Sequence, residues 1–441
     1  MGNSQPKLEK KFASLPAQVF PTSEREAANS ENVRRSLRRS LRRAKKKKHE
    51  FSYDMRRASA NPKRKIPHKV PLLDTVETLF LPEYSVNGHI SERHFEVKEV
   101  IAKGAFGNVL KVLRWNDNKP FAMKVMKKHQ VLEEGAVKQC KDEASIQAAV
   151  SSHPFIVEPH WFFQNRDFVF IVMEYIPRGE LFAFWKQYDL FSEDLVRIYA
   201  AELGMVLDYL HMSGIIYRDL KMENILIDTE GDKIGTRKSN YSFFVIVDKY
   251  QGPCHIKVID FGLAKWLKKS QKTSTICGTL QYIAPEILSL RPYGHTSDWW
   301  SLGILIYTLL VGHYPVKGAE NHIQMRYMIE GHLYDLPEDG YYSEPCRDCV
   351  RMLLQKLPQT RICSMKALRR HIFIRDVNLE SLYNRQFSPN KLIIELERHQ
   401  REMTLSRSNS LADGLDDSLI HYGDLTFAWN QSVASLDAVD V

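Results

Sequence analysis

Two short polar segments in the second half of the chain carry the residue types that phosphoryl transfer requires. The first, residues 217–224 (YRDLKMEN), contains Asp219, Lys221 and Asn224, and the second, residues 260–262 (DFG), begins with an aspartate. Transfer of a phosphoryl group needs a carboxylate that orients the attacking hydroxyl, a cation beside the γ-phosphate and oxygen ligands for Mg²⁺. Because the two segments supply these types in a suitable order, they indicate a catalytic centre.

Two weaker signals lie upstream. Gly104 and Gly107 flank a turn between two predicted strands, where glycine lets backbone N–H groups approach a phosphate, although such glycines often only make a hairpin. Lys124 interrupts an apolar strand, which is costly for a charge unless it is paired, and Glu143 in a predicted helix is a candidate partner. Taken alone, Lys124 is more simply explained as an exposed lysine on an edge strand.

The elements that must position these residues change along the chain. Residues 95–115 predict a strand, a glycine turn and a second strand, and residues 121–128 predict another strand. Residues 133–150 have a helical composition, and residues 168–176 form a buried strand. From Ser192 onward the pattern is mostly helical. Strands first and helices later predict an α+β fold with a small β-rich lobe followed by a larger helical lobe.

With residues 284–286 (APE), these segments resemble the eukaryotic protein kinases over about residues 95–374. Within that superfamily, Tyr217, the loop 275–279 (TICGT) and residues 298–300 (DWW) resemble the AGC group, and most closely the RSK-type kinases related to ribosomal-protein kinases. The resemblance implies the two-lobed protein kinase fold with ATP in the cleft. It also implies transfer of the γ-phosphate of ATP to serine and threonine hydroxyls.

The resemblance assigns a role to each matching residue. It implies that Asp219 is the catalytic base, that Lys221 steadies the transferring phosphoryl group, and that Asn224 and Asp260 bind Mg²⁺. The residues that it implies for ATP binding are Ile101, Ala102, Lys103, Gly104, Ala105, Phe106, Gly107, Asn108, Val109, Ala122, Lys124, Glu143, Met173, Glu174, Ile176 and Leu226.

Regulation and substrate choice are implied in the same way. Thr275 matches an activation-loop phosphosite whose phosphate Arg218 and Lys265 would receive, so an upstream activating kinase is an expected partner. Glu180 and Glu223 match carboxylates that bind arginines three and two residues before the acceptor. The expected substrates are therefore proteins with basic residues upstream, in Arg-x-x-Ser/Thr contexts.

Four departures from the family pattern bear on activity. Ala102 replaces the first glycine of the phosphate loop, and Gln139 replaces a histidine that senses the activation-loop phosphate. Gln147 and Pro159 stand where large apolar residues form a column that links the lobes. Residues 232–254 are an insertion within a strand hairpin, either a simple extension or a docking or inhibitory strand. These departures leave a pseudokinase scaffold with weak or no phosphotransfer as the alternative function.

The remaining sequence predicts tails. Residues 1–90 predict a disordered basic tail, and residues 375–441 predict a polar, mostly disordered tail with a helix at 390–403. The net charge of +9 is concentrated in residues 34–48, which carry ten positive charges and no acid. The rest is nearly neutral, so no nucleic-acid readout is expected. The basic run fits a nuclear-import signal, an anionic-membrane patch or a solvated tail.

The cysteines and the N-terminus bear on location. Cys346 and Cys349 invite a zinc site with Cys363 and His371, but their positions match helix leucines of the family, which favours core packing. Few cysteines, no signal-peptide core and no long apolar stretch predict an intracellular, soluble protein. We expect a cytoplasmic location, with nuclear or peripheral membrane location and myristoylation of Gly2 left open.

Overall fold

The computed structural model describes the part of the chain that begins at Thr75. The described residues are 75–86, 88–104, 106–188, 190–228, 254–268, 270–338, 340 and 342–412, and after Gln400 the only described side chain is that of Glu402. The chain divides into two compact units, residues 1–72 and 73–441, and all described residues belong to the second. Gly2, the basic run 34–48, Ala105 and the insertion up to residue 253 therefore lie outside the described residues.

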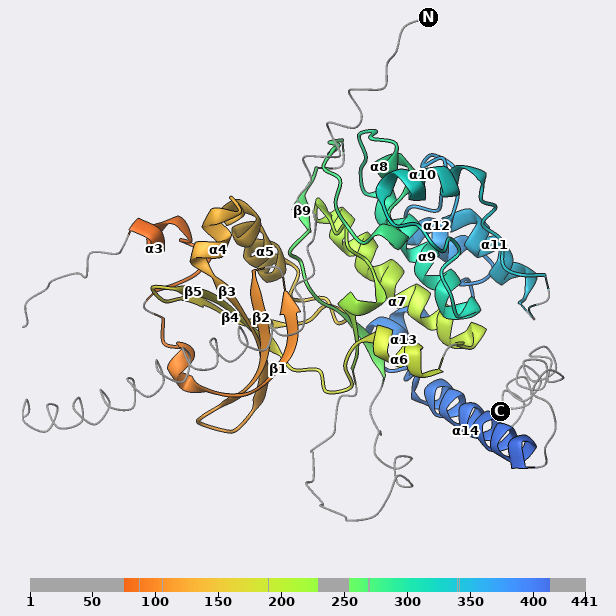
Figure 1. Cartoon of the computed structure of the whole chain (residues 1–441), viewed down its shortest axis with the longest axis horizontal. Coiled ribbons are helices and arrows are strands. Elements are labelled where there is room, and N and C mark those ends of the chain that lie inside the picture. Colours follow the sequence, from red (N-terminus) through yellow and green to blue (C-terminus); the bar gives the residue numbers. More distant parts are fainter. Residues whose placement is uncertain are drawn as a thin grey trace, which may run out of the picture. The chain divides into compact units, whose positions relative to one another are not determined.

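An antiparallel sheet forms the N-lobe, with α4 and α5 beside it (Figure 1). Its strand order is β1-β2-β3-β5-β4, so β3 lies in the middle. The elements of this lobe are α3 (Thr75–Leu79), η1 (Glu92–His94), β1 (Phe95–Gly104), β2 (Gly107–Arg114), β3 (Pro120–Lys127), α4 (Lys128–Glu133), α5 (Val137–Ala149), β4 (Pro159–Gln164) and β5 (Phe168–Glu174).

The C-lobe is mostly helical, with two short two-stranded sheets, β6–β9 and β7–β8. Its elements are α6 (Leu181–Tyr188), α7 (Glu193–Met212), β6 (Ile215–Ile216), η2 (Met222–Asn224), β7 (Ile225–Asp228), β8 (His255–Val258), β9 (Lys265–Trp266), η3 (Leu280–Tyr282), α8 (Pro285–Leu288), α9 (Thr296–Val311), α10 (His322–Gly331), α11 (Glu344–Leu353), α12 (Met365–Arg370), α13 (Leu379–Tyr383) and α14 (Asn390–Ala412). The predicted two-lobed α+β fold is confirmed.

The period of two in β3 places Lys124 on a defined face of the sheet. Ala122 and Met126, two residues to either side, belong to an apolar cluster that also contains Cys140 and Ala144 of α5. Because alternate residues of a strand point to the same face, Lys124 lies on the face that packs against α5. The lysine that interrupts the apolar strand is therefore placed beside the helix that carries its expected partner.

The long helix α7 of the C-lobe has local signals at both of its ends. In α7, the Ser192 side chain accepts a hydrogen bond from the N–H of Leu195, and Gly214 follows the helix with φ +74°. The helix α9 is apolar on all sides because it is surrounded by the core, where Trp299 and Trp300 have no exposed surface. This buried helix supplies Asp298, whose carboxylate accepts hydrogen bonds from the backbone of Tyr217 and Arg218.

The folded part extends beyond both expected boundaries. Sequence patterns predict tails before residue 91 and after residue 374, yet Phe80 and Tyr84 near α3 are fully buried, and so is nearly all of Leu382 in α13. The helix expected at 390–403 is present as α14. Phe80, Tyr84 and Leu382 are buried in clusters with residues far away in the sequence, whereas other apolar residues of these segments, such as Leu79 and Phe387, are more than 40% exposed. The local apolar periodicity of these segments therefore gives little indication that they are folded.

The C-terminal elements contact both ends of the connection between β7 and β8. Arg385, after α13, forms an ion pair with Asp228 at the end of β7. The thiol of Cys254, just before β8, donates to Asn390 Oδ1 at 3.4 Å at the start of α14. The chain between them, residues 229–253, includes most of the predicted insertion and lies outside the described residues. The base of the hairpin is thus held by residues far away in the sequence.

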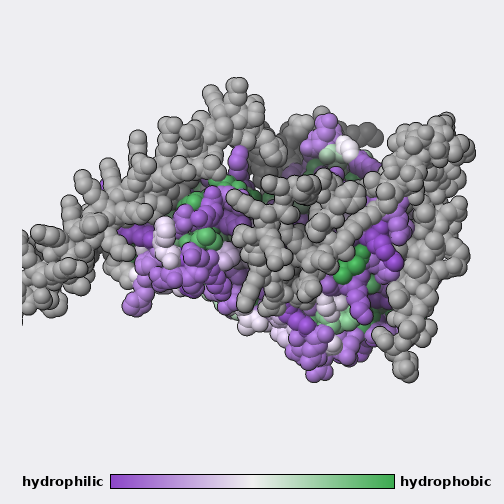
Figure 2. Space-filling view, turned by 90° about the horizontal axis from the view of Figure 1, so that it is seen from below, coloured by the Kyte–Doolittle hydropathy of each residue, from purple (hydrophilic) through white to green (hydrophobic). Residues whose placement is uncertain are grey.

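Among the described residues, every helix is too short or too polar to span a bilayer. On the face that Figure 2 presents, the described surface is mostly hydrophilic, with small separate hydrophobic areas.

Cys346 and Cys349 are fully buried in the C-lobe core, as the packing interpretation expects. Burial raises the pKa of both thiols, that of Cys349 to about 12. Cys363 is exposed, and His371 Nε2 lies 2.9 Å from the carboxylate of Asp348. Within the described ranges, no group of three or more histidine, cysteine and acidic side chains is arranged to hold a metal ion.

Candidate active site

An ion-paired lysine joins the sheet to α5. Lys124 Nζ lies 2.5 Å from Glu143 Oε1 and 3.0 Å from Asp260 Oδ1. Burial alone lowers the pKa of Lys124, but the two carboxylates outweigh this effect and raise it above its ordinary value. Burial also raises the pKa of Glu143, against the effect of Lys124. The lysine is therefore charged at neutral pH and held between two carboxylates.

Asp260 has an unusual backbone conformation. Its φ is +58°, in the left-handed region that non-glycine residues rarely adopt. The N–H of Gly262 donates to Asp260 Oδ1 at 3.0 Å, and a Cβ on that glycine would lie only 3.0 Å from the same oxygen. The surrounding protein raises the pKa of Asp260, but Lys124 and the Gly262 N–H hold it below its ordinary value. With 47% of its side chain exposed, this carboxylate is ionised and accessible.

A buried carboxylate fixes the loop that carries Asp219. Asp298 of α9 accepts hydrogen bonds from the N–H groups of Tyr217 and Arg218, both at 2.9 Å, and lies 2.8 Å from His211 Nε2. Arg218 has a φ of +70°. A strained backbone persists only where its surroundings determine it, so Asp298 is a positioning residue for the neighbouring Asp219.

Asp219 is the centre of a polar network. Its Oδ2 lies 2.9 Å from Lys221 Nζ and accepts a hydrogen bond from Asn224 Nδ2 at 2.8 Å. Its Oδ1 accepts from the hydroxyl of Thr279 at 3.1 Å, and Lys221 Nζ also donates to that hydroxyl at 3.0 Å. The structure therefore brings together the three predicted catalytic residues, and the carboxylate already binds a hydroxyl group as an acceptor residue would require.

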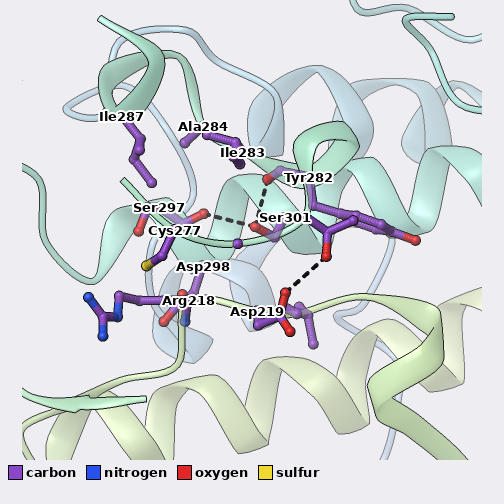
Figure 3. Close-up of a pocket in the computed structure, with 13 residues that line it drawn as sticks. Arg218, Asp219, Cys277, Tyr282, Ile283, Ala284, Ile287, Ser297, Asp298 and Ser301 are labelled. Atoms are coloured by element: carbon purple, nitrogen blue, oxygen red, sulfur yellow. Dashed lines mark hydrogen bonds between the residues drawn. The ribbon is translucent and has the colours of Figure 1, made fainter. Parts of the chain in front are cut away.

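A pocket lies at this network, with Arg218 and Asp219 on one side and Tyr282, Ile283 and Ala284 on the opposite side (Figure 3). The complete lining consists of Arg218, Asp219, Leu220, Cys277, Gly278, Thr279, Tyr282, Ile283, Ala284, Ile287, Ser297, Asp298 and Ser301.

Sequence reasoning missed the contacts of two residues in this site. The motifs that contain Thr279 and Asp298 indicate the kinase group, but they do not reveal these contacts. Thr279 binds the Asp219 carboxylate, and Asp298 holds the loop that carries Asp219. A signal for Asp298 was available, because an acid at the start of an otherwise apolar helix needs a buried partner. Nothing local to Thr279 indicates its contact, since its partner lies 60 residues earlier.

The residues expected around the nucleotide come from both lobes. Ala122 of β3 and Met173 of β5 are register partners, as are Ala102 of β1 and Val109 of β2. Leu226 lies in β7 of the C-lobe. The others lie on or next to the same strands and α5: Ile101, Lys103 and Gly104 in β1, Phe106 after it, Gly107 and Asn108 in β2, Lys124 in β3, Glu143 in α5, and Glu174 and Ile176 at the end of β5. Ala105 lies outside the described residues.

The two glycines of the β1–β2 turn differ in how closely other atoms approach them. A Cβ on Gly107 would lie 1.8 Å from the carbonyl oxygen of Val125 in β3, so only glycine allows this approach of the two backbones. A Cβ on Gly104 would meet nothing closer than 3.7 Å. Gly107 is therefore required by the sheet itself, whatever else it does for a phosphate.

The column that links the lobes is mixed in character. Tyr217 and Phe261 pack edge to face with ring centroids 5.5 Å apart. Gln147 is buried, and its Nε2 lies 4.0 Å from Met173 Sδ. Pro159 of β4 is the register partner of Met173. A buried amide with a thioether partner is weakly satisfied, so this part of the column packs less favourably than an apolar pair.

The residues expected to receive a phosphate have other partners here. Thr275 is exposed, and Lys265 Nζ donates to the hydroxyl of Thr273 at 3.2 Å. Arg218 Nε donates to the carbonyl oxygen of Leu263 at 2.7 Å. The two cations thus flank the activation loop but do not meet at Thr275 in this structure.

Gln139 has a defined role in this arrangement. Its side-chain amide donates to the carbonyl oxygen of Gly262 at 2.8 Å, which ties α5 to the loop of Asp260. The contact is neutral, so it contributes no charge toward a phosphorylated Thr275.

Two carboxylates lie together beside the catalytic loop. Burial, and then the charge of Glu223, raise the pKa of Glu180, while Lys221 lowers it. Glu223 Oε2 is buried and has no hydrogen-bond partner within the described structure. Two residues before Glu180, Arg178 pairs with Glu397 of α14 at 2.6 Å, which fixes this segment. An incoming cation would relieve the repulsion between the two acids.

A sheet lobe and a helical lobe that meet at such a set of charges make up the fold and site of a protein kinase. The chain belongs to the protein kinase domain family, whose model matches residues 95–374. Its relatives carry the names of AGC-group serine/threonine kinases, which confirms the group to which the motifs point.

Three relatives illustrate the similarity. A human protein named "Ribosomal protein S6 kinase-related protein" is 40% identical over 56% of this chain and 54% of its own length. A serine/threonine-protein kinase by name from Caenorhabditis elegans is 35% identical over 71% of this chain and 66% of its own length. A "RAC family serine/threonine-protein kinase homolog" of Dictyostelium discoideum is 34% identical over 67% and 61%. The matched region thus spans about half to two thirds of the length of these relatives.

Proposed function

We propose that this chain is an ATP- and Mg²⁺-dependent serine/threonine protein kinase. The observation that carries the proposal is the complete polar set at Asp219, where Lys221, Asn224 and a hydroxyl group all contact one carboxylate. Asp219 would orient the acceptor hydroxyl and accept its proton, while Lys221 would neutralise charge on the transferring group.

The residues present fit Mg²⁺-bound ATP. Asn224 donates through its nitrogen to Asp219, which leaves its amide oxygen to face a cation, and Asp260 offers an ionised carboxylate. Both are the hard oxygen donors that Mg²⁺ prefers. ATP with Mg²⁺ would supply the phosphoryl group and neutralise its charge. Lys124 would hold phosphate oxygens, and Glu143 would keep that lysine in place.

The test is incubation of the purified full chain with radiolabelled ATP and a Ser/Thr peptide, beside Asp219→Asn prepared identically. Transfer by the wild type and none by the variant is the expected result. Equal labelling by both proteins would mean that the activity is a contaminant. Wild type that binds ATP but transfers nothing would favour the pseudokinase scaffold, for which the weakly satisfied Gln147 is the supporting observation.

We further propose that Glu180 selects substrates with arginine three residues before the acceptor. Glu180→Gln is expected to reduce the ratio of kcat/KM between an Arg-x-x-Ser peptide and its alanine counterpart by roughly 10–100-fold, because a charge-assisted bond contributes about 1.5–3 kcal/mol. Two further carboxylates of the family are replaced in this chain by the neutral Gln281 and Thr308. We therefore expect no strong preference for arginine two residues before the acceptor.

The matched control for this measurement is Glu133→Gln, since the Glu133 side chain is 73% exposed. It should leave the peptide ratio unchanged. A wild-type enzyme that is indifferent to arginine at minus three, or that prefers an acid there, would remove this role from Glu180.

We also propose that an upstream kinase phosphorylates Thr275. Protein carrying phosphothreonine at this position is expected to be roughly 10–100-fold more active than unmodified protein, because Arg218 gains charge-assisted bonds while the neutral Gln139 adds none. The measurement compares kcat of the two forms, with Thr275→Ala as the unmodifiable control. A gain of many hundredfold would contradict the weak coupling assigned to Gln139.

We also propose a location for this protein in the cell. A cytoplasmic kinase that also enters the nucleus or touches anionic membranes through residues 34–48 fits the ten positive charges of that run. Sedimentation with phosphatidylserine vesicles, before and after neutral substitution of these charges, distinguishes membrane contact from a solvated tail.

A further inference from the structure

The segment before the sheet, residues 75–86, packs on α5, the helix that carries Glu143. Phe80 and Tyr84 have no exposed surface, and their rings meet edge to face at 6.4 Å. Both belong to the apolar cluster that contains Cys140 and Ala144 of α5. This segment lies outside residues 95–374, the region that the family model matches.

Hydrogen bonds join the segment to one turn of α5. The hydroxyl of Tyr84 donates to the carbonyl oxygen of Cys140 at 3.1 Å. The next residue, Lys141, donates to the carbonyl oxygen of Leu81 at 2.6 Å and lies 3.0 Å from the carboxylate of Glu83. These contacts fall in the turn immediately before the ion-pairing glutamate.

The segment is also joined to the edge strand of the sheet. The buried side chain of Gln164 in β4 donates to the carbonyl oxygens of Glu77 at 3.1 Å and Tyr84 at 2.7 Å. The N–H of Gln164 donates to Ser85 O at 2.9 Å, and a parallel bridge forms between Ser85 and β4. Residues 75–86 thus connect a fixed strand to a helix.

The helix α5 contributes few large apolar side chains of its own to its packing. It has no side-chain N-cap, and most of its buried positions carry small or polar residues: Cys140, Glu143, Ala144 and Gln147, with Ile146 as the one large apolar residue. Aromatic rings bury much more apolar area than such residues, so Phe80 and Tyr84 supply a large share of the packing that holds the helix.

We propose that residues 75–86 are a positioning element of the active site. Phe80 and Tyr84 hold α5, and through it Glu143, at the distance from Lys124 that nucleotide binding requires. If the segment is displaced, α5 loosens, Glu143 leaves Lys124, and the lysine is no longer directed at the phosphates. The inference rests on the proposed kinase function and extends the machinery beyond the matched domain.

The main test is the double variant Phe80→Ser with Tyr84→Ser in the full chain. Its kcat/KM for ATP is expected to fall at least tenfold. A free peptide of residues 75–86 should restore at least half of the lost activity, whereas the same peptide with both substitutions should not. Restoration in trans is not expected of a residue that merely stabilises the fold. The control is Leu333→Ser, which should leave kcat/KM unchanged, because Leu333 is 86% exposed and lies outside residues 75–86.

A second variant keeps the inference testable if the double variant does not fold. Tyr84→Phe removes only the hydroxyl, so it should fold normally, raise the KM for ATP several-fold and speed amide hydrogen exchange in residues 137–149 at least threefold. Unchanged exchange and unchanged KM in Tyr84→Phe overturn the inference, as does a double variant with wild-type kcat/KM.

Exchange of α5 amides requires no phosphotransfer, so it separates the two proposals. A chain without kinase activity whose α5 exchanges faster in Tyr84→Phe would refute the proposed function and support the positioning role. An active kinase in which Tyr84→Phe leaves the exchange of α5 amides unchanged would support the proposed function and refute the positioning role.

Discussion

Asp219→Ala and Asp260→Ala are both expected to lower phosphotransfer by at least about a thousandfold, but only Asp260→Ala should strongly weaken binding of Mg²⁺-bound ATP. The two aspartates differ in what they touch. Asp219 contacts hydroxyl and amide groups, whereas Asp260 pairs with Lys124 and is the carboxylate that would bind Mg²⁺ under the proposed function. Radiolabel transfer measures the first effect, and titration with a fluorescent ATP analogue with and without Mg²⁺ measures the second.

The control for both variants is Asp376→Ala, because the Asp376 side chain is 84% exposed and, among the described residues, its ion pair is with its neighbour Arg375 at 3.4 Å. It should leave transfer and nucleotide affinity unchanged. If Asp219→Ala weakened nucleotide binding as much as Asp260→Ala, the separation of roles between the acceptor and metal sides of the site would be wrong.

Arg361→Ala is expected to lower the free energy of unfolding by about 3–5 kcal/mol, as is usual when one partner of a buried ion pair is removed. The Arg361 guanidinium has no exposed surface and donates two bonds to Glu286 at 2.9 and 3.0 Å. It also donates to the carbonyl oxygens of Thr296 and Gln355, and it lies 5.2 Å from the centre of the Trp300 ring. The substitution leaves the Glu286 carboxylate buried and unpaired.

Urea unfolding followed by tryptophan fluorescence measures this effect, provided that the slope of the transition is unchanged. Arg351→Ala is the matched control, since that arginine also binds two acids but is 39% exposed, and its loss should cost no more than about 1 kcal/mol. Similar losses in the two variants would mean that burial adds little to the Arg361 pair.

Much of the candidate site could be predicted because its chemistry restricts residue type at fixed spacing. Asp219 and Asn224 lie five residues apart on one loop, so their contact follows from local geometry once the motif is recognised. The Lys124–Glu143 pair was also predictable, because a lysine in an apolar strand needs a partner and the next helix offers one.

Other parts could not be predicted because their signal lies in distant partners. Phe80 and Tyr84 precede the first predicted strand, in a segment without helical or strand periodicity, and their packing against α5 and β4 is what makes them core residues. Likewise, Arg178 and Glu397 are 219 residues apart, so nothing local in α14 indicates that it docks on the C-lobe. The contacts of Thr279 and Asp298 are long-range in the same sense.

The anchored base of the β7–β8 hairpin has a consequence for the long connection that it closes. The entropy cost of closing a loop grows only with the logarithm of its length, about 0.6 kcal/mol for each doubling. Asp228 and Cys254 are held by Arg385 and Asn390, so the ends of the loop are fixed independently of its length. Insertions or deletions within residues 229–253 are therefore expected to cost little free energy and to leave Asn224, which directly precedes β7, in place.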